Sequence, residues 1–187
     1  SSASPFAKFQ AFMHMTHYLI HPLMLTLALL APFLLMQEVK FLKGLVLWGF
    51  GALLLISCTG PSRMYLVAER ALGRPYTKIL ALLPLMICFG CGLAVNNTRA
   101  VLEALIGRSS AFVRTPKSGA RERKRYAVAQ SPLVLLELAV GLWCLFGMIL
   151  YFASQHYLIG HFMLIYAVGF LGIGIFSWRH ANERART

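Results

Sequence analysis

Long stretches without charged side chains constrain this chain more than any other feature of its sequence. Residues 18–36, 44–62 and 79–98 contain no Lys, Arg, Asp or Glu, and residues 132–178 contain only Glu137. A helix of about 20 apolar residues is long enough to cross the hydrocarbon core of a bilayer. The composition agrees, because 58% of the residues are hydrophobic and only 13% are charged, a balance that is unusual in soluble domains. The sequence therefore predicts a membrane protein.

The last of these stretches is long enough for two crossings. It is interrupted at 154–161, where Ser, Gln, His and Gly cluster. We expect a tight connection there, with membrane spans at 132–153 and 158–178. Together these two spans would form a transmembrane hairpin.

The distribution of positive charge predicts how the spans are oriented. Residues 61–131 carry 12 basic and 3 acidic residues, whereas the connection at 154–161 has no Lys or Arg. Because basic loops are retained in the cytoplasm, we expect 154–161 outside and both 131 and 179 inside. The sequence thus predicts a multi-pass protein of the plasma (inner) membrane with both ends cytoplasmic.

The stretch at 79–98 has basic residues on both sides, so a full crossing would place one basic segment outside. The flanking cations are Arg63, Arg70, Arg74, Lys78, Arg99 and Arg108. Residues that interrupt a regular span also occur inside it, namely Pro84, Gly90, Gly92, Asn96 and Asn97. We therefore expect a re-entrant or in-plane element at the cytoplasmic interface, which leaves four true spans. A five-span arrangement, in which 79–98 crosses the membrane, remains the alternative.

An amphipathic helix and a basic loop follow this stretch. In 97–107, one helical face carries Val101, Leu102, Leu105 and Ile106, which favours a helix lying on the membrane surface. Residues 108–131 then lose all apolar periodicity and include a basic run at 121–125. Unstructured connections of this length are usually functional or disordered. The run has no interleaved aromatic residues, so it favours anionic lipid over nucleic acid as its partner.

The predicted fold class is an all-α membrane protein with about four transmembrane helices plus cytoplasmic interfacial and re-entrant amphipathic helices. The predicted parts are a cytoplasmic interfacial segment at 1–17, a transmembrane hairpin at 18–62, interfacial and re-entrant helices at 63–107, a basic loop at 108–131, a second transmembrane hairpin at 132–178 and a cytoplasmic tail at 179–187. The first residue is Ser and no signal peptide precedes the spans, so we expect the chain to begin inside a larger protein.

The acidic residues limit the chemistry that this chain can perform. All six are glutamates, and the sequence has no aspartate. That excludes a paired-aspartate dyad, an aspartate-rich metal motif and a Ser-His-Asp triad. Any catalysis must use other residues or another polypeptide.

The histidines suggest a haem anchor only at first sight. His14, His17 and His21 share one helix face, and His156 and His161 lie near the predicted external connection. Two axial ligands must lie at one depth, whereas these groups are expected on opposite sides of a hydrocarbon core about 30 Å thick. Interfacial histidines are the favoured interpretation.

Two short motifs in the spans favour packing over chemistry. Cys88 and Cys91 form a CxxC that lacks a second such pair, so they are interpreted as small apolar packing residues. The spacing of Gly169, Gly172 and Gly174 is similar to that of a dinucleotide-binding fingerprint, but no strand precedes these glycines. Close helix packing explains them better.

Glu137 is an ionisable residue within a predicted span. Such residues indicate a proton or substrate path by default. Glu137 lies only five residues after Pro132 and close to the basic loop, so pairing with an arginine at the interface is expected.

A known family has a segment similar to residues 96–119, which read NNTRAVLEALIGRSSAFVRTPKSG. They resemble the interfacial helix and gating loop of membrane-integrated family 2 glycosyltransferases, the group of bacterial cellulose synthase and related β-glycan synthases. The family's loop has a Phe-x-Val-Thr-x-Lys pattern, which this chain matches at Phe112, Thr115 and Lys117 and departs from at Arg114. Residues 8–22 are also similar to the stretch that follows the catalytic domain in such enzymes. The resemblance covers nearly the whole chain in order and topology.

The resemblance implies that this chain is the membrane, translocation-channel and gating-loop part of a processive glycosyltransferase. Such an enzyme transfers a sugar from a nucleotide-sugar donor to a growing glycan. Thr115 and Lys117 would contact the donor diphosphate, Arg114 would be a further phosphate ligand and Phe112 would anchor the loop. Channel-lining aromatics would include Tyr18, Phe33, Trp143 and Tyr151.

The family's aspartate motifs and its acceptor motif, Gln-x-x-Arg-Trp, are absent from this chain. The resemblance therefore implies a separate catalytic domain, which would hold a Mg or Mn ion. It also implies that this chain has no catalytic residue, binds no cofactor and is inactive alone. The implied partners are membrane lipid and, through the catalytic domain, nucleotide sugar and glycan. Nucleic acid is not among them. The alternative is a small non-enzymatic membrane protein, either a haem or quinone anchor or an assembly subunit.

Overall fold

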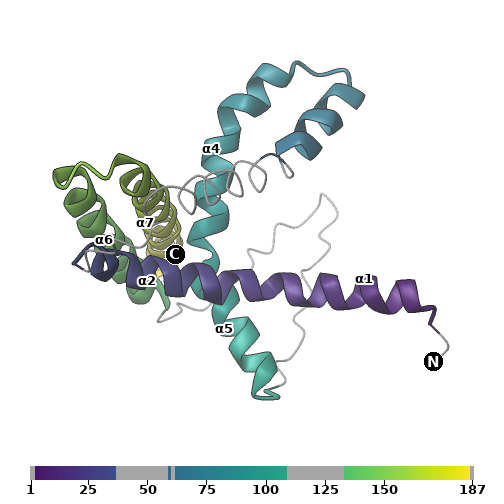
Figure 1. The fold of residues 1–187 in the computed structure, drawn as a ribbon, viewed down its shortest axis with the longest axis horizontal. Helices are drawn as coiled ribbons and strands as arrows, with labels where there is room; N and C mark the ends of the chain where they lie inside the picture. The colour runs from purple at the N-terminus through teal and green to yellow at the C-terminus, as the bar shows by residue number, and fades with distance from the viewer. Residues whose placement is uncertain (1–2, 37–58, 60–61, 109–132, 186–187) are drawn as a thin grey trace.

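The computed structural model describes residues 3–36, 59, 62–108 and 133–185. Every regular element in these ranges is a helix (Figure 1). In chain order they are α1 (Pro5–Thr16), the short 3-10 helix η1 (His17–Leu19), α2 (Ile20–Met36), α4 (Tyr76–Gly92), α5 (Ala94–Leu105), α6 (Leu133–Ala153) and α7 (Tyr157–Ala185). Residues 62–71 are also helical. Most of the predicted span at 44–62 and most of the basic loop at 108–131 lie outside the described residues.

The first helix begins earlier than hydropathy predicts. The hydroxyl of Ser4 accepts a hydrogen bond from the backbone N–H of Ala7 at 3.2 Å, and Pro5 occupies the first helical turn. Both residues favour a helix start at that point. α1, η1 and α2 follow one another without a break, and Pro5–Leu34 is long and apolar enough to cross a membrane. The 3-10 turn ends three residues before Pro22, whose ring disfavours a regular helix four residues upstream.

α4 and α5 form a bent pair. Their axes differ by 40° at a break next to Leu93, and together they are long and apolar enough for a broken span or a re-entrant loop. α5 ends in a Schellman motif, in which Gly107 has φ +74° and the N–H of Arg108 donates to the carbonyl of Glu103 at 2.9 Å. The predicted interruption of 79–98 is therefore found just after Gly92.

α6 and α7 form the predicted hairpin. Gln155 has φ 61°, and the N–H of His156 donates to the carbonyl of Tyr151 at 2.8 Å, so the turn occupies only Ser154, Gln155 and His156. The predicted connection at 154–161 is too long, because one left-handed residue reverses the chain and α7 starts at Tyr157. α7 also continues past the predicted end at 178, to Ala185.

The core lies where α2, the start of α5, α6 and α7 meet. Its fully buried side chains are mostly small or aliphatic, with one tyrosine and one phenylalanine: Ala28, Ala31, Ala94, Val95, Val140, Cys144, Tyr151, Met163, Ala167 and Phe170. In the part of the chain that the structure describes, three helices are long and apolar enough to cross a membrane, or four if α4 and α5 count as one span. The chain is thus an all-α membrane protein, as its charge-free stretches predict.

Candidate functional site

The residues expected to contact the donor, Phe112, Arg114, Thr115 and Lys117, lie outside the described residues. The element that leads into this segment is α5, which ends seven residues before Phe112. α5 is therefore the described part of the candidate site.

α5 is amphipathic, as the sequence predicts. Its buried side consists of Ala94, Val95 and Thr98 near its start, whereas Leu105 and Ile106 near its end are 73% and 76% exposed. Arg99 and Glu103, one turn apart, form an ion pair at 2.7 Å on the surface. The start of α5 is thus fixed in the bundle, and its end presents an apolar surface away from it.

A hydrogen bond between side chains links α5 to α2. The side-chain amide nitrogen of Asn97 and Nε2 of His21 lie 3.0 Å apart, within hydrogen-bond distance. Nδ1 is buried and has no hydrogen-bond partner. The sequence groups His21 with the other histidines and does not reveal this link, because the two residues are 76 positions apart.

Two more polar groups are buried in the described part of the chain. Thr98 is 8% exposed and Glu137 is 4% exposed, and neither Oγ1 of Thr98 nor Oε2 of Glu137 has a hydrogen-bond partner. Thr98 is one helical turn from Ala94, and Glu137 is one turn from Gly141, on the faces that pack into the bundle. The arginine expected to pair with Glu137 is not found among the described residues.

Two of the four aromatic residues expected to line a channel lie side by side. The rings of Phe33 in α2 and Trp143 in α6 have centroids 5.2 Å apart, and Phe146 extends the row at 5.7 Å from Trp143. The indole N–H of Trp143 donates to the carbonyl of Leu29 at 3.0 Å, which fixes its ring against α2. Phe33 and Phe146 are about half exposed. We call Phe33, Trp143 and Phe146 the aromatic row.

The other two aromatic residues have different surroundings. Tyr151 is buried in the core, and its hydroxyl donates to the carbonyl of Ala31. Tyr18 is half exposed, with its ring edge-on to the rings of His14 and His17 at centroid distances of 6.0 and 5.8 Å. The structure therefore brings only Phe33 and Trp143 of this set together.

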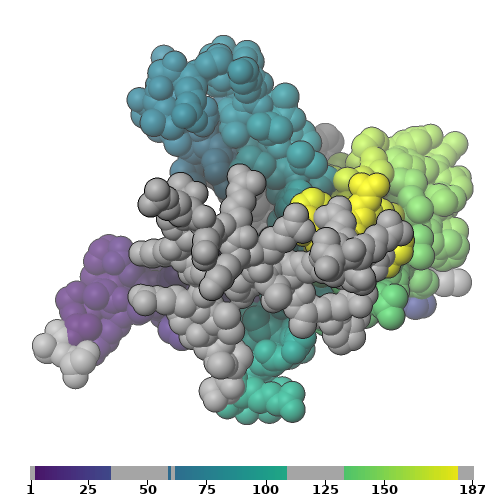
Figure 2. Space-filling view, turned by 180° about the vertical axis from the view of Figure 1, so that it is seen from behind, coloured from purple at the N-terminus to yellow at the C-terminus, as the bar shows by residue number. Residues whose placement is uncertain are grey.

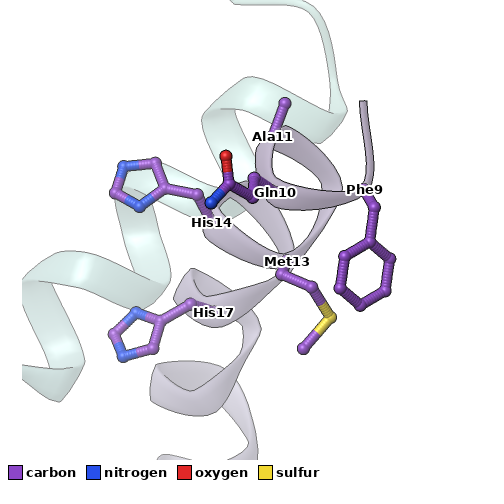
Figure 3. A pocket seen from close by; sticks show the side chains of 6 residues that line it. All are labelled: Phe9, Gln10, Ala11, Met13, His14 and His17. Carbon is purple, nitrogen blue, oxygen red and sulfur yellow. The ribbon is translucent and has the colours of Figure 1, made fainter. Parts of the chain in front are cut away.

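His14 and His17 also border a surface hollow on α1 (Figure 3). The hollow takes its lining residues from α1 and from the first residue of η1: Phe9, Gln10, Ala11, Met13, His14 and His17. In Figure 3 the two imidazoles lie on one side of the helix, and Phe9 and Met13 lie on the other. Within the described ranges, no group of three or more His, Cys, Asp or Glu side chains is arranged to hold a metal ion.

The two short motifs take part in helix packing. A Cβ atom at Gly169 would overlap the carbonyl oxygen of Cys88, and one at Gly92 would overlap the carbonyl oxygen of Gly169. A Cβ atom at Gly174 would lie 2.8 Å from the side chain of Leu138, whereas one at Gly172 would meet open space. Cys91 is a buried free thiol. Close packing of helices is therefore confirmed for Gly169 and Gly174.

The fold and these contacts define a helical membrane protein with a polar junction between α2 and α5 and an aromatic row between α2 and α6. No protein-family model, curated protein or solved structure matches the chain significantly.

Proposed function

We propose that this chain is the membrane, channel and gating-loop part of a processive family 2 glycosyltransferase of the plasma (inner) membrane. The observation that carries the proposal is the order of elements at 94–117. An amphipathic helix with an apolar exposed end leads, after six residues, into the sequence Phe112-Val-Arg-Thr-Pro-Lys117. This is the order of interfacial helix and gating loop in the enzymes that the chain resembles.

The proposed role of the loop follows from the chemistry of donor cleavage. Negative charge accumulates on the nucleotide diphosphate as the glycosidic bond forms. Lys117 and Arg114 supply cations and Thr115 supplies a hydroxyl donor, so closing the loop over the donor stabilises the transition state and excludes water. Phe112 anchors the closed loop. The nucleotide sugar, the glycan and the divalent metal bind through a catalytic domain that is not in this chain.

The aromatic row supports the role of the spans in glycan passage. Flat aromatic faces stack against the apolar faces of sugar rings, and Phe33, Trp143 and Phe146 present three such rings in succession. Trp143 is fixed by its hydrogen bond to Leu29, so the row is pre-organised. Both chain ends are cytoplasmic in this proposal, because the donor nucleotide is a cytoplasmic compound.

The test compares two lysines in the enzyme that contains the catalytic domain, reconstituted in lipid. Lys117→Ala should reduce turnover by roughly 10- to 1,000-fold, since it removes one electrostatic donor from the transition state. Lys124→Ala removes the same charge from the basic run and should leave turnover nearly unchanged. Initial rates over a range of nucleotide-sugar concentrations measure the difference. Equal rates for the two variants would remove the assignment of 112–117 as a gating loop.

A further inference from the structure

Residues 62–78 form a helical hairpin that stands away from the bundle (Figure 1). A helix at 62–71 ends in a Schellman motif at Gly73, which has φ +66°, and the chain turns into the first residues of α4. In the space-filling view the hairpin projects at the top, clear of the other described helices (Figure 2). α4 is held to α7 farther along, around Cys88 and Gly92. We call residues 62–78 the basic hairpin.

The basic hairpin carries a concentrated positive charge. Its four cations are all exposed: Arg63, Arg70, Arg74 and Lys78. Its one acidic residue, Glu69, lies 3.9 Å from Arg74, which leaves a net charge of +3 on 17 residues. Arg63 and Arg70 are seven positions apart and therefore share one face of the helix. A concentration of charge of this kind attracts an anionic partner.

The same hairpin exposes large apolar side chains between its cations. Met64, Val67, Leu72 and Tyr76 are 65%, 66%, 64% and 57% exposed. Water alone would solvate the cations but not these side chains. An anionic bilayer surface suits both, because the apolar groups enter the boundary between headgroups and acyl chains while Arg and Lys extend to the phosphates.

The position of the hairpin in the chain also favours lipid as the partner. Lys78 is directly followed by the charge-free stretch at 79–98, which together with the rest of α4 and α5 is apolar enough for a broken span or a re-entrant loop. A broken span or re-entrant loop of this kind would place the start of α4 at a membrane surface. We propose that the basic hairpin docks on anionic phospholipid headgroups of the leaflet beside it, with Leu72 and Tyr76 inserted between them. This docking does not depend on the proposed glycosyl transfer.

The experiment places a polarity-sensitive fluorophore at the tip of the hairpin. Leu72→Cys is labelled in a chain whose native cysteines are replaced by serine, and the chain is reconstituted in vesicles of phosphatidylcholine alone or of phosphatidylcholine mixed with phosphatidylglycerol. The label should report a more apolar environment in the anionic vesicles, and salt should reduce the effect. Each basic residue near an anionic surface contributes about a fivefold change in partitioning, so Arg63→Gln with Arg70→Gln should weaken docking about 25-fold.

A matched control removes two cations elsewhere. Arg99→Gln with Arg179→Gln loses the same charge outside the hairpin and should keep the response to phosphatidylglycerol. A second test needs no charge variant: the labelled chain with all its arginines and lysines is reconstituted in vesicles that contain a cationic lipid. These vesicles should release the hairpin, and this result does not depend on how well the arginine variants fold. The proposal is overturned if the label reports the same polarity in all vesicles. It is equally overturned if the signal follows the protein-to-lipid ratio, which would indicate that a second copy covers the hairpin.

Discussion

Thr98 illustrates how a single residue departs from what its sequence neighbourhood predicts. It follows Asn96 and Asn97 at the end of an apolar stretch, where a polar run indicates the membrane interface. Instead its hydroxyl is buried and without a hydrogen-bond partner. Such a hydroxyl lowers stability, because its bonds to water are lost and not replaced.

Thr98→Val should therefore leave the free energy of unfolding unchanged or raise it by about 1 kcal/mol. The exposed Thr26 is the control, since its hydroxyl donates to the carbonyl of Pro22 at 2.8 Å and Thr26→Val should change stability by less than about 0.5 kcal/mol. Unfolding of the purified chain in mixed detergent micelles measures both. A loss of more than about 1 kcal/mol for Thr98→Val would mean that the hydroxyl has a partner.

At the scale of single residues, the sequence predicts packing better than polar contacts. Gly169 and Gly174 could be assigned to helix packing because small residues within a span allow close approach. The bond between Asn97 and His21 could not be predicted, because it joins residues from distant parts of the chain. The place of Phe146 beside Trp143 could not be predicted either, since it depends on the rotation of α6.

At the scale of elements, α4 and α7 cross in close contact. Gly92 and Gly169 bring the two backbones together without any side chain between them. Gly169→Ala should cost about 1–3 kcal/mol or more, because its new Cβ would overlap the carbonyl oxygen of Cys88 and force the helices apart.

Gly172 is a matched control on the same helix, three residues away, with open space where a Cβ would lie. Gly172→Ala should be neutral or stabilise α7 by up to about 1 kcal/mol through its helix propensity. The same unfolding measurement serves for both variants. Equal stabilities would show that the helices do not cross at Gly169.

The elements themselves were largely predictable, and their ends were not. Long charge-free stretches indicate helices in a membrane because backbone polar groups must be paired there. The start at Pro5 depends instead on the capping hydroxyl of Ser4, which hydropathy does not register. The turn at Gln155 likewise depends on one left-handed residue.

For the molecule as a whole, orientation in the membrane is the prediction on which the proposed function depends. Cysteine labels at Ser118 and a reporter fused after Thr187 should both report the cytoplasm, whereas labels at Ser154 should react with an external reagent. The asymmetry of Lys and Arg along the sequence is the physical reason. If Ser118 reacted with the external reagent, residues 112–117 would lie on the side of the membrane opposite to the cytoplasmic nucleotide sugar. That result would contradict the assignment of a gating loop.

The continuous helix from Pro5 to Leu34 has a consequence for bilayer thickness. Its 30 residues span about 45 Å, against about 30 Å for the hydrocarbon core. The helix must tilt strongly or extend beyond the acyl chains. The exposed Phe6, Phe9 and Phe12 lie at its amino-terminal end, which is the part that would extend. Longer acyl chains would cover more of these rings and bring the helix closer to the bilayer normal. Hydrophobic mismatch thus makes the angle of the amino-terminal helix a function of the lipids that surround it.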